Sequence, residues 1–186
     1  MNNFYDWFNE NVTDDMINHF TDRTNKHIDL VQKYCKIIDE LFPNRFPGLI
    51  ERGRVHDDSK FSQYELEPYI ILTEKYRTKR VDGIDLELPD YVQTEMDSAW
   101  ENHYTVNDHH LNFYAPEVDG FLHVEAMPDS AVAEMIADWL AMSEEFDSST
   151  YDWLNKNMNV KWSVSHHIEN LIFEILDKVV ESGDGK

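Results

Sequence analysis

The chain has 186 residues, enough for one domain with a substantial buried core. Its formal net charge of -21 argues against coating of DNA or RNA, because affinity for polyphosphates depends on lysine and arginine. A hydrophobic content of 41% is typical of a globular chain. No apolar run reaches the ~20 residues of a membrane span, and the N-terminus lacks the basic start of a signal peptide. Cys35 is the sole cysteine, so no internal disulfide can form and we expect a cytoplasmic protein.

The positive charge is concentrated in one part of the acidic chain. Eight of the 16 basic residues lie between positions 45 and 80, namely Arg45, Arg52, Arg54, Lys60, Lys75, Arg77, Lys79 and Arg80. This pattern has two interpretations. The residues are either ordinary solvated side chains or a local site for a small anion such as phosphate.

A first long helix is predicted from about Thr21 to Leu41. Its apolar positions recur at spacings of three and four residues, so they share one face: His27, Val31, Tyr34, Ile38 and Leu41. His27 is therefore expected on the buried side. From this helix alone, His27 is either a hydrogen-bonded core histidine or a ligand. Residues 4–20, rich in aromatic and acidic side chains, predict one or two short helices.

The His56-Asp57 dipeptide is the centre of the second predicted helix, over residues 49–60. Lys60 lies one helical turn beyond His56 and is expected on the same face. Helix is predicted to continue from Phe61 to Tyr76, followed by a polar loop over residues 77–89.

Another helix is predicted to begin at Pro89-Asp90. Its apolar stripe consists of Val92, Met96, Trp100 and His103, so a histidine again ends an apolar stripe. His109 and His110 follow where this helix is expected to end. Residues 111–127 are expected to form a loop that covers the site.

Pro128-Asp129-Ser130 is typical of a helix start. The stripe that follows is Ala131, Met135, Asp138 and Met142, and an ionised aspartate on such a stripe is costly to bury without a cation. Glu134, one turn earlier, is either an outer partner of the site or a solvated side chain, and the solvated interpretation is favoured. A last helix is predicted at about residues 164–180, with a core-packing stripe of Ile168, Leu171, Ile172, Ile175 and Val179. His166 and His167 are expected to be structural or exposed.

Several imidazoles and carboxylates thus occupy positions where packing would favour leucine. A shared divalent cation accounts for them economically, since neutral imidazole and carboxylate are common metal ligands. The sequence therefore predicts a metal-dependent enzyme.

A helix histidine, a His-Asp pair and a distant helix aspartate resemble the HD-domain superfamily of metal-dependent phosphohydrolases. The likeness covers about His27 to Asp138. It implies an all-α, single-domain helical bundle over residues 1–186, with the metal-site core at about 21–142. It also implies that His27, His56, Asp57 and Asp138 coordinate one metal.

Members with two metals carry extra histidines in the interval where His103, His109 and His110 stand here. By this likeness, Asp57 would bridge two ions, and Lys60 matches a lysine of the phosphodiesterase branch. That branch's Gly-Tyr-Pro signature is absent, and the gap from His103 to His109 is shorter than usual. The stretch from Trp100 to His110 also resembles a small, largely uncharacterised phage and bacterial family.

The first functional hypothesis is a phosphohydrolase that acts on a nucleotide or a related small phosphate ester. The hypothesis assigns Asp57 and Lys60 to catalysis, and Arg54 with Lys60 to phosphate binding. The cofactor would be one or two ions of Mn, Mg, Fe, Co, Ni or Zn. The alternatives are a di-iron oxygenase on the same scaffold and a non-catalytic acidic regulator that mimics nucleic acid. No membrane partner is expected, and association of identical chains is left open.

Overall fold

The computed structural model describes residues 3–185, which form eight α-helices, two short 3-10 helices and two short strands. The predicted helical class is confirmed. The chain divides into two compact units. The first contains residues 3–25 and 57–106, and the second contains residues 26–56 and 107–185. None of the helices in this described part combines the length and the apolar character needed to cross a membrane.

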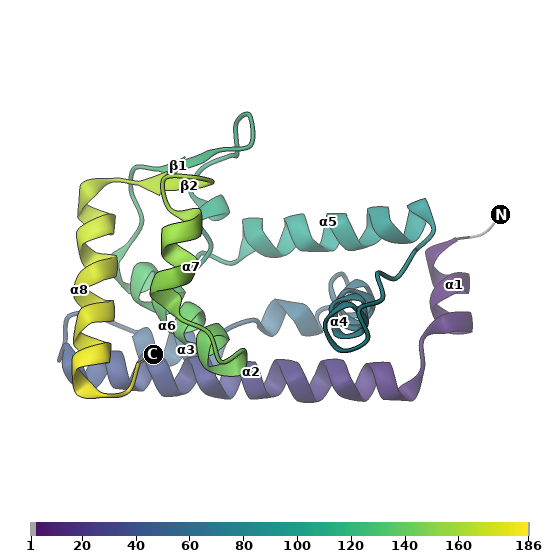
Figure 1. Ribbon diagram of the computed structural model, residues 1–186, viewed down its shortest axis with the longest axis horizontal. Helices are drawn as coiled ribbons and strands as arrows, with labels where there is room; N and C mark the ends of the chain where they lie inside the picture. Colours follow the sequence, from purple (N-terminus) through teal and green to yellow (C-terminus); the bar gives the residue numbers. More distant parts are fainter. Residues whose placement is uncertain (1–2, 186) are drawn as a thin grey trace. The chain divides into compact units, whose positions relative to one another are not determined.

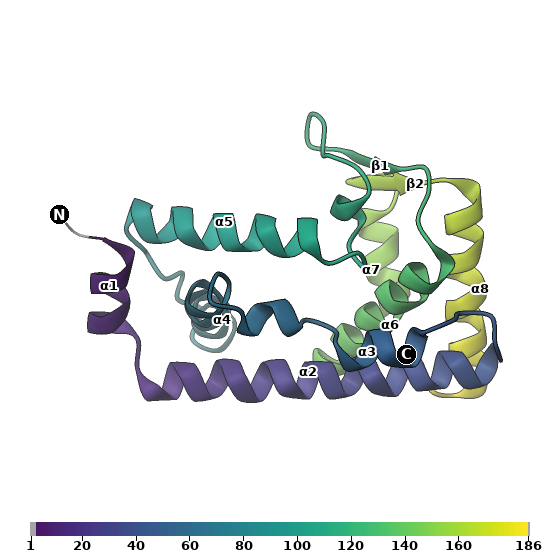
Figure 2. The same cartoon turned by 180° about the vertical axis from the view of Figure 1, so that it is seen from behind.

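The first unit consists of α1 (Phe4–Asn11), the start of α2 (Asp14–Leu41), the 3-10 helix η1 (Asp58–Phe61), α4 (Leu66–Val81) and α5 (Asp90–Val106). Figure 2 shows α1 close to α5, and the two helices are in contact. Their shared apolar cluster contains Phe4, Ile71, Val92 and Met96. A second cluster joins Phe20 to α4 through Tyr69 and Ile70.

The second unit contains the remainder of α2, α3 (Leu49–Arg54), the 3-10 helix η2 (Leu111–Phe113), α6 (Asp129–Glu145), α7 (Thr150–Asn157) and α8 (His166–Ser182). Its core is built on α6 and α8, which pack against each other. Two three-residue strands, β1 (Leu122–Val124) and β2 (Trp162–Val164), lie side by side (Figure 1). They run parallel, with His123 opposite Ser163. This apolar packing fixes α6, the helix that supplies most of the acidic groups discussed below.

Three predicted apolar stripes are largely confirmed. Val31, Tyr34 and Ile38 are buried on α2, as are the five stripe residues of α8. On α5 the buried positions are Val92, Met96, Ala99 and His103, whereas Trp100 is 48% exposed. The Trp100 prediction was wrong because Ala99, one residue earlier, occupies the buried direction of the helix.

Several predicted boundaries were also wrong. The long helix begins at Asp14 rather than Thr21, since the Thr13 hydroxyl accepts from the Met16 backbone N–H and starts it there. α4 runs through Val81 into the expected polar loop. Pro68 lies in the first turn of α4, where its missing N–H costs little. The expected loop of residues 111–127 contains η2 and β1, and α7 lies in a stretch for which no helix was predicted.

The predicted helix over residues 49–60 is broken at the His-Asp pair. α3 ends at Arg54, and Asp57 adopts a left-handed conformation with a φ of 60° before η1 begins. Left-handed backbone is unfavourable for most residues and is best tolerated by glycine, asparagine and aspartate. His56 and Asp57 therefore lie in a tight turn rather than on a helix face, and the shared helical face of His56 and Lys60 was predicted wrongly.

Candidate metal centre

Helix α6 presents three carboxylates on one face of the second unit. Glu134, Asp138 and Glu145 are separated by four and seven residues, which places them in line along the helix. The Glu134 side chain is 5% exposed, the Asp138 side chain 15% and the Glu145 side chain 11%. The prediction that Glu134 is solvated was wrong. A line of shielded carboxylates needs cationic or hydrogen-bonding partners.

His27, on α2, reaches two of these carboxylates. Its Nε2 atom lies 3.0 Å from Asp138 Oδ1, and its Nδ1 atom lies 3.7 Å from Glu145 Oε2. Burial alone would raise the pKa of Asp138, but the contacts with His27 and the nearby imidazoles lower it well below its ordinary value. The predicted meeting of His27 with Asp138 is thus present within this unit.

His56 lies just after α3 and has the same two kinds of neighbour. Its Nδ1 atom is 2.9 Å from Glu134 Oε1, while its Nε2 atom is 4.0 Å from Asp138 Oδ1. The rings of His27 and His56 have centroids 5.6 Å apart. Both histidines therefore direct Nε2 toward Asp138 and Nδ1 toward a glutamate of α6.

These three residues fit the geometry of a cation site. His27, His56 and Asp138 each offer one ligand atom, and these atoms lie within 4.8 Å of one another. Ligand atoms ~2.1 Å from a shared ion are ~3.0 Å apart at right angles, ~3.4 Å apart in tetrahedral geometry and ~4.2 Å apart when opposite. The separations of 3.0 and 4.0 Å fall in this range. Two imidazoles and one carboxylate suit Mn, Fe, Co, Ni or Zn better than Mg, which favours oxygen ligands.

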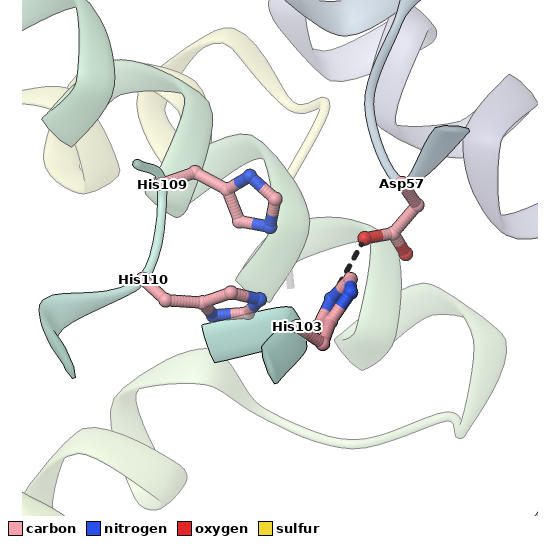
Figure 3. A group of neighbouring side chains, drawn as sticks. All are labelled: Asp57, His103, His109 and His110. Carbon is pink, nitrogen blue, oxygen red and sulfur yellow. Dashed lines mark ion pairs between the residues drawn. The ribbon is translucent and has the colours of Figure 1, made fainter. Parts of the chain in front are cut away.

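His109 follows α5 in the chain but belongs to the second unit. Its Nδ1 atom lies 3.4 Å from Glu134 Oε1, the oxygen that also faces His56. The ring centroids of His56 and His109 are 4.2 Å apart. Figure 3 shows the neighbouring rings of His109 and His110, whose centroids are 4.1 Å apart. A single carboxylate oxygen therefore faces two imidazoles.

The other oxygen of Glu134 faces a fixed cation. Arg52 Nη2 lies 2.7 Å from Glu134 Oε2, and the same guanidinium is bonded to Asp108. Burial would raise the pKa of Glu134, but the hydrogen bonds with His109 and His56 lower it to about 2. His56, His109 and Glu134 also lie close enough to hold an ion. However, a guanidinium on the same carboxylate repels a dication, so we interpret Glu134 as an orienting group.

The first unit contains a separate cluster around His103 of α5. His103 Nε2 lies 3.1 Å from Asp57 Oδ1 (Figure 3), and His103 Nδ1 lies 3.0 Å from Glu65 Oε2. Glu65 is fully buried and accepts hydrogen bonds from the Ser59 hydroxyl and the Asn102 amide. Burial alone would lower the pKa of His103, but Asp57 and Glu65 raise it above its ordinary value.

Lys60 completes this cluster by pairing with Asp57. Its Nζ atom lies 2.5 Å from Asp57 Oδ2 and 5.4 Å from the centre of the Tyr69 ring. The side chain of Asp57 is 2% exposed, whereas that of Lys60 is 20% exposed. The predicted roles of Lys60 and Asp57 in catalysis stay predictions, as does the second metal shared by Asp57, His103, His109 and His110.

The basic residues between positions 45 and 80 are largely engaged in ion pairs within their own units. Arg54 pairs with Glu51 on the exposed side of α3, Arg45 with Glu174, Arg77 with Asp15 and Glu74, and Lys79 with Asp85. These pairs favour the interpretation as ordinary surface charges over a collected anion site. Phosphate binding by Arg54 stays a prediction.

The sequence pointed to the histidines and Asp138, and it offered Glu134 as an outer partner without favouring that interpretation. Glu65 and Glu145 were missed. Glu145 carried a signal, since Glu134 and Glu145 stand at helical spacing from Asp138 on one stripe. Glu65 lies at the start of α4, where an acidic residue is ordinary helix-start chemistry and indicates no site.

Residues 16–178 match a family of unknown function, DUF5662, and the chain belongs to this family. No curated protein and no solved structure matches it.

Proposed function

We propose that this member of the DUF5662 family is a metal-dependent phosphohydrolase whose metal is held by His27, His56 and Asp138. One observation carries the proposal. Each of the two histidines has Nδ1 beside a glutamate of α6 and Nε2 directed toward Asp138. Histidine ligands of metals characteristically have their second ring nitrogen held by a carboxylate or another hydrogen-bonding group. His56 has that hydrogen bond at 2.9 Å, whereas the His27 Nδ1 atom lies 3.7 Å from Glu145, at ion-pair distance.

The residues have separate roles in this proposal. His27, His56 and Asp138 would hold the ion, while Glu134 and Glu145 fix the histidine rings. A divalent ion held there would lower the pKa of a bound water, to about 7 in the case of zinc, and would provide an electrostatic partner for phosphoryl oxygens. Three protein ligands leave coordination positions open for that water and for a substrate oxygen.

The resemblance to HD-domain phosphohydrolases extends the proposal. It implies that Asp57, the residue after His56 in the chain, is a further ligand of the first ion, and it allows a second ion. It also assigns a nucleotide or another small phosphate ester as substrate, with Lys60 and Arg54 as phosphate-binding candidates. Cys35 is a buried free thiol, which suits the cytoplasmic location that we propose.

A non-haem iron oxygenase is the second candidate. Two histidines and one carboxylate with open positions are the ligand set of many iron(II) oxygenases, and His27, His56 and Asp138 provide that set. The two candidates share the metal site and differ in the reaction at the open positions.

The test begins with protein purified without chelators. Metal content is measured by mass spectrometry, and the metal-free protein is then loaded with Mn²⁺, Co²⁺, Zn²⁺ or, without oxygen, Fe²⁺. Phosphate release is followed across a panel of nucleotides and phosphate esters, and oxygen consumption is followed with the iron-loaded protein. We expect metal-dependent phosphate release by the wild type, loss of it in Asp138→Asn and its retention in Glu144→Gln. Glu144 lies on the same helix but contacts Lys33 and Tyr34.

Each other outcome has a defined meaning. Oxygen consumption without phosphate release would overturn the phosphohydrolase assignment in favour of the oxygenase. A wild type that binds no divalent metal would overturn both and leave the acidic regulator.

A further inference from the structure

The two carboxylate oxygens of Glu134 contact different partners. Oε1 lies 2.9 Å from His56 Nδ1 and 3.4 Å from His109 Nδ1, while Oε2 lies 2.7 Å from Arg52 Nη2. The side chains of Glu134, His56 and His109 are each at most 5% exposed. The arrangement is thus a largely buried, charge-assisted network within the second unit.

This geometry determines which ring nitrogen of each histidine carries hydrogen. An ionised carboxylate accepts hydrogen bonds and cannot donate them. Both Nδ1 atoms that face Glu134 Oε1 must therefore carry hydrogen when the imidazoles are neutral. The hydrogen-free Nε2 lone pairs of His56 and His109 then point away from Glu134, in the form that binds a metal.

We infer that Glu134 is a shared positioning residue, which sets His56 and His109 in the tautomer and orientation needed for metal binding, and that Arg52 fixes Glu134 for this task. The inference rests on the metal site proposed above. It assigns His109 the same ligand-ready state as His56, and it assigns Arg52 a role in metal affinity.

Replacement of Glu134 by glutamine tests the inference because an amide has only one acceptor oxygen. Arg52 can only donate, so the oxygen of Gln at position 134 is expected to turn toward Arg52. The amide NH₂ group then faces His56 and His109 and requires an acceptor at Nδ1. Hydrogen would move to Nε2 and block the metal-binding lone pair. Loss of Arg52 would release the amide oxygen to face the histidines again.

The experiment uses the full metal-free chain and two readouts. Long-range ¹H–¹⁵N NMR reports the tautomers of His56 and His109, and titration with Co²⁺ reports affinity and, through its absorption bands, ligand geometry. The variants are Glu134→Gln, the double variant Glu134→Gln with Arg52→Met, and Glu144→Gln as the matched control on α6. Circular dichroism establishes that each variant is folded.

We expect the Nδ1–H tautomer at both histidines in the wild type. Glu134→Gln should lower Co²⁺ affinity by about 10- to 100-fold, and the double variant should regain part of that loss. Glu144→Gln should bind as the wild type does. A purely structural Glu134 predicts no recovery in the double variant, because a second contact is lost there.

Three results would overturn the inference. They are the Nε2–H tautomer in the wild type, unchanged Co²⁺ affinity in Glu134→Gln, and a double variant weaker than the single one. The wild-type tautomer decides the matter even if Glu134→Gln does not fold. A wild type that binds no Co²⁺ would instead refute the proposed metal site, while the tautomers would still test the role of Glu134.

Discussion

His103 in the first unit and His27 and His56 in the second have similar neighbours but different charge environments. In each case Nδ1 faces a glutamate and Nε2 faces an aspartate. The aspartate of the first unit, Asp57, is also paired with Lys60, and the pKa of His103 is raised. That cluster therefore contains its own positive charge.

In the cluster of the second unit, the aspartate has a different set of charged partners. Within the described part of the chain, Asp138 is paired with the two histidines and with no lysine or arginine. Arg52 is occupied by Glu134 and Asp108. Similar side chains around histidine can thus form an internally neutralised cluster or a group that could hold an added cation. Among the described residues, His27, His56 and Asp138 fit the second description.

The largest expected effect comes from the removal of the Asp138 charge. Asp138→Asn should weaken divalent metal binding by about 100-fold or more, since loss of a direct ligand exceeds the cost of losing an outer partner. Asp129→Asn is the matched control, because Asp129 lies on the same helix and pairs with the exposed His167. Calorimetric titration with Mn²⁺ or Co²⁺ measures the difference. Equal affinities in the two variants would remove the distinction between the clusters.

A smaller effect is expected when the internal cation of the first unit is removed. Lys60→Met removes the ammonium group paired with the buried Asp57 while the contact with His103 is kept, and it should lower the free energy of unfolding by about 1–3 kcal/mol. Urea unfolding in the presence of a chelator provides the measurement.

Lys79→Met is the control for Lys60→Met, since Lys79 and Asp85 form an exposed pair worth about 0–1 kcal/mol. If both variants lose the same small amount of stability, Lys60 is not the counter-charge of the cluster. If Lys60→Met is stable but defective only toward a phosphate ester, Lys60 has the phosphate-binding role predicted from the sequence.

The smallest effect concerns pH. Because the folded-state pKa of His103 is raised, its stabilisation is fully present below the unfolded value of about 6.5 and is lost as pH rises through the folded value. The stability advantage of the wild type over His103→Gln should therefore shrink as pH rises from 6 to 9.

Chelated protein is required for this pH series, so that metal binding does not contribute. His166→Gln is the control, because the His166 side chain is 98% exposed. A difference between the wild type and His103→Gln that stays constant with pH would show that His103 is not held as a cation between Asp57 and Glu65.

The sequence predicted much of the helical framework because its apolar periodicity reflects burial directly. The stripe of α8 and the buried positions of α2 follow from spacing alone. The short strands β1 and β2 could not be predicted, since three residues give no periodicity and their pairing joins segments about 40 residues apart.

The candidate metal ligands could be predicted from the sequence, but the residues that orient them could not. His27 and Asp138 stood out because they occupy apolar stripes. Glu134 did not, since a glutamate on a helix is normally solvated and only the tertiary contacts with Arg52 and His56 show otherwise. The turn at Asp57 was hidden for a similar reason. Its left-handed backbone gives no pattern in the sequence, so the stretch resembled a continuous helix.

The most direct test of the central claim is anomalous X-ray diffraction from crystals of the full chain loaded with Mn²⁺ or Co²⁺, recorded at the metal's absorption edge. We expect an anomalous peak ~2.0–2.3 Å from His27 Nε2, His56 Nε2 and a carboxylate oxygen of Asp138. A loaded crystal with metal bound elsewhere, and no peak among these three side chains, would contradict it.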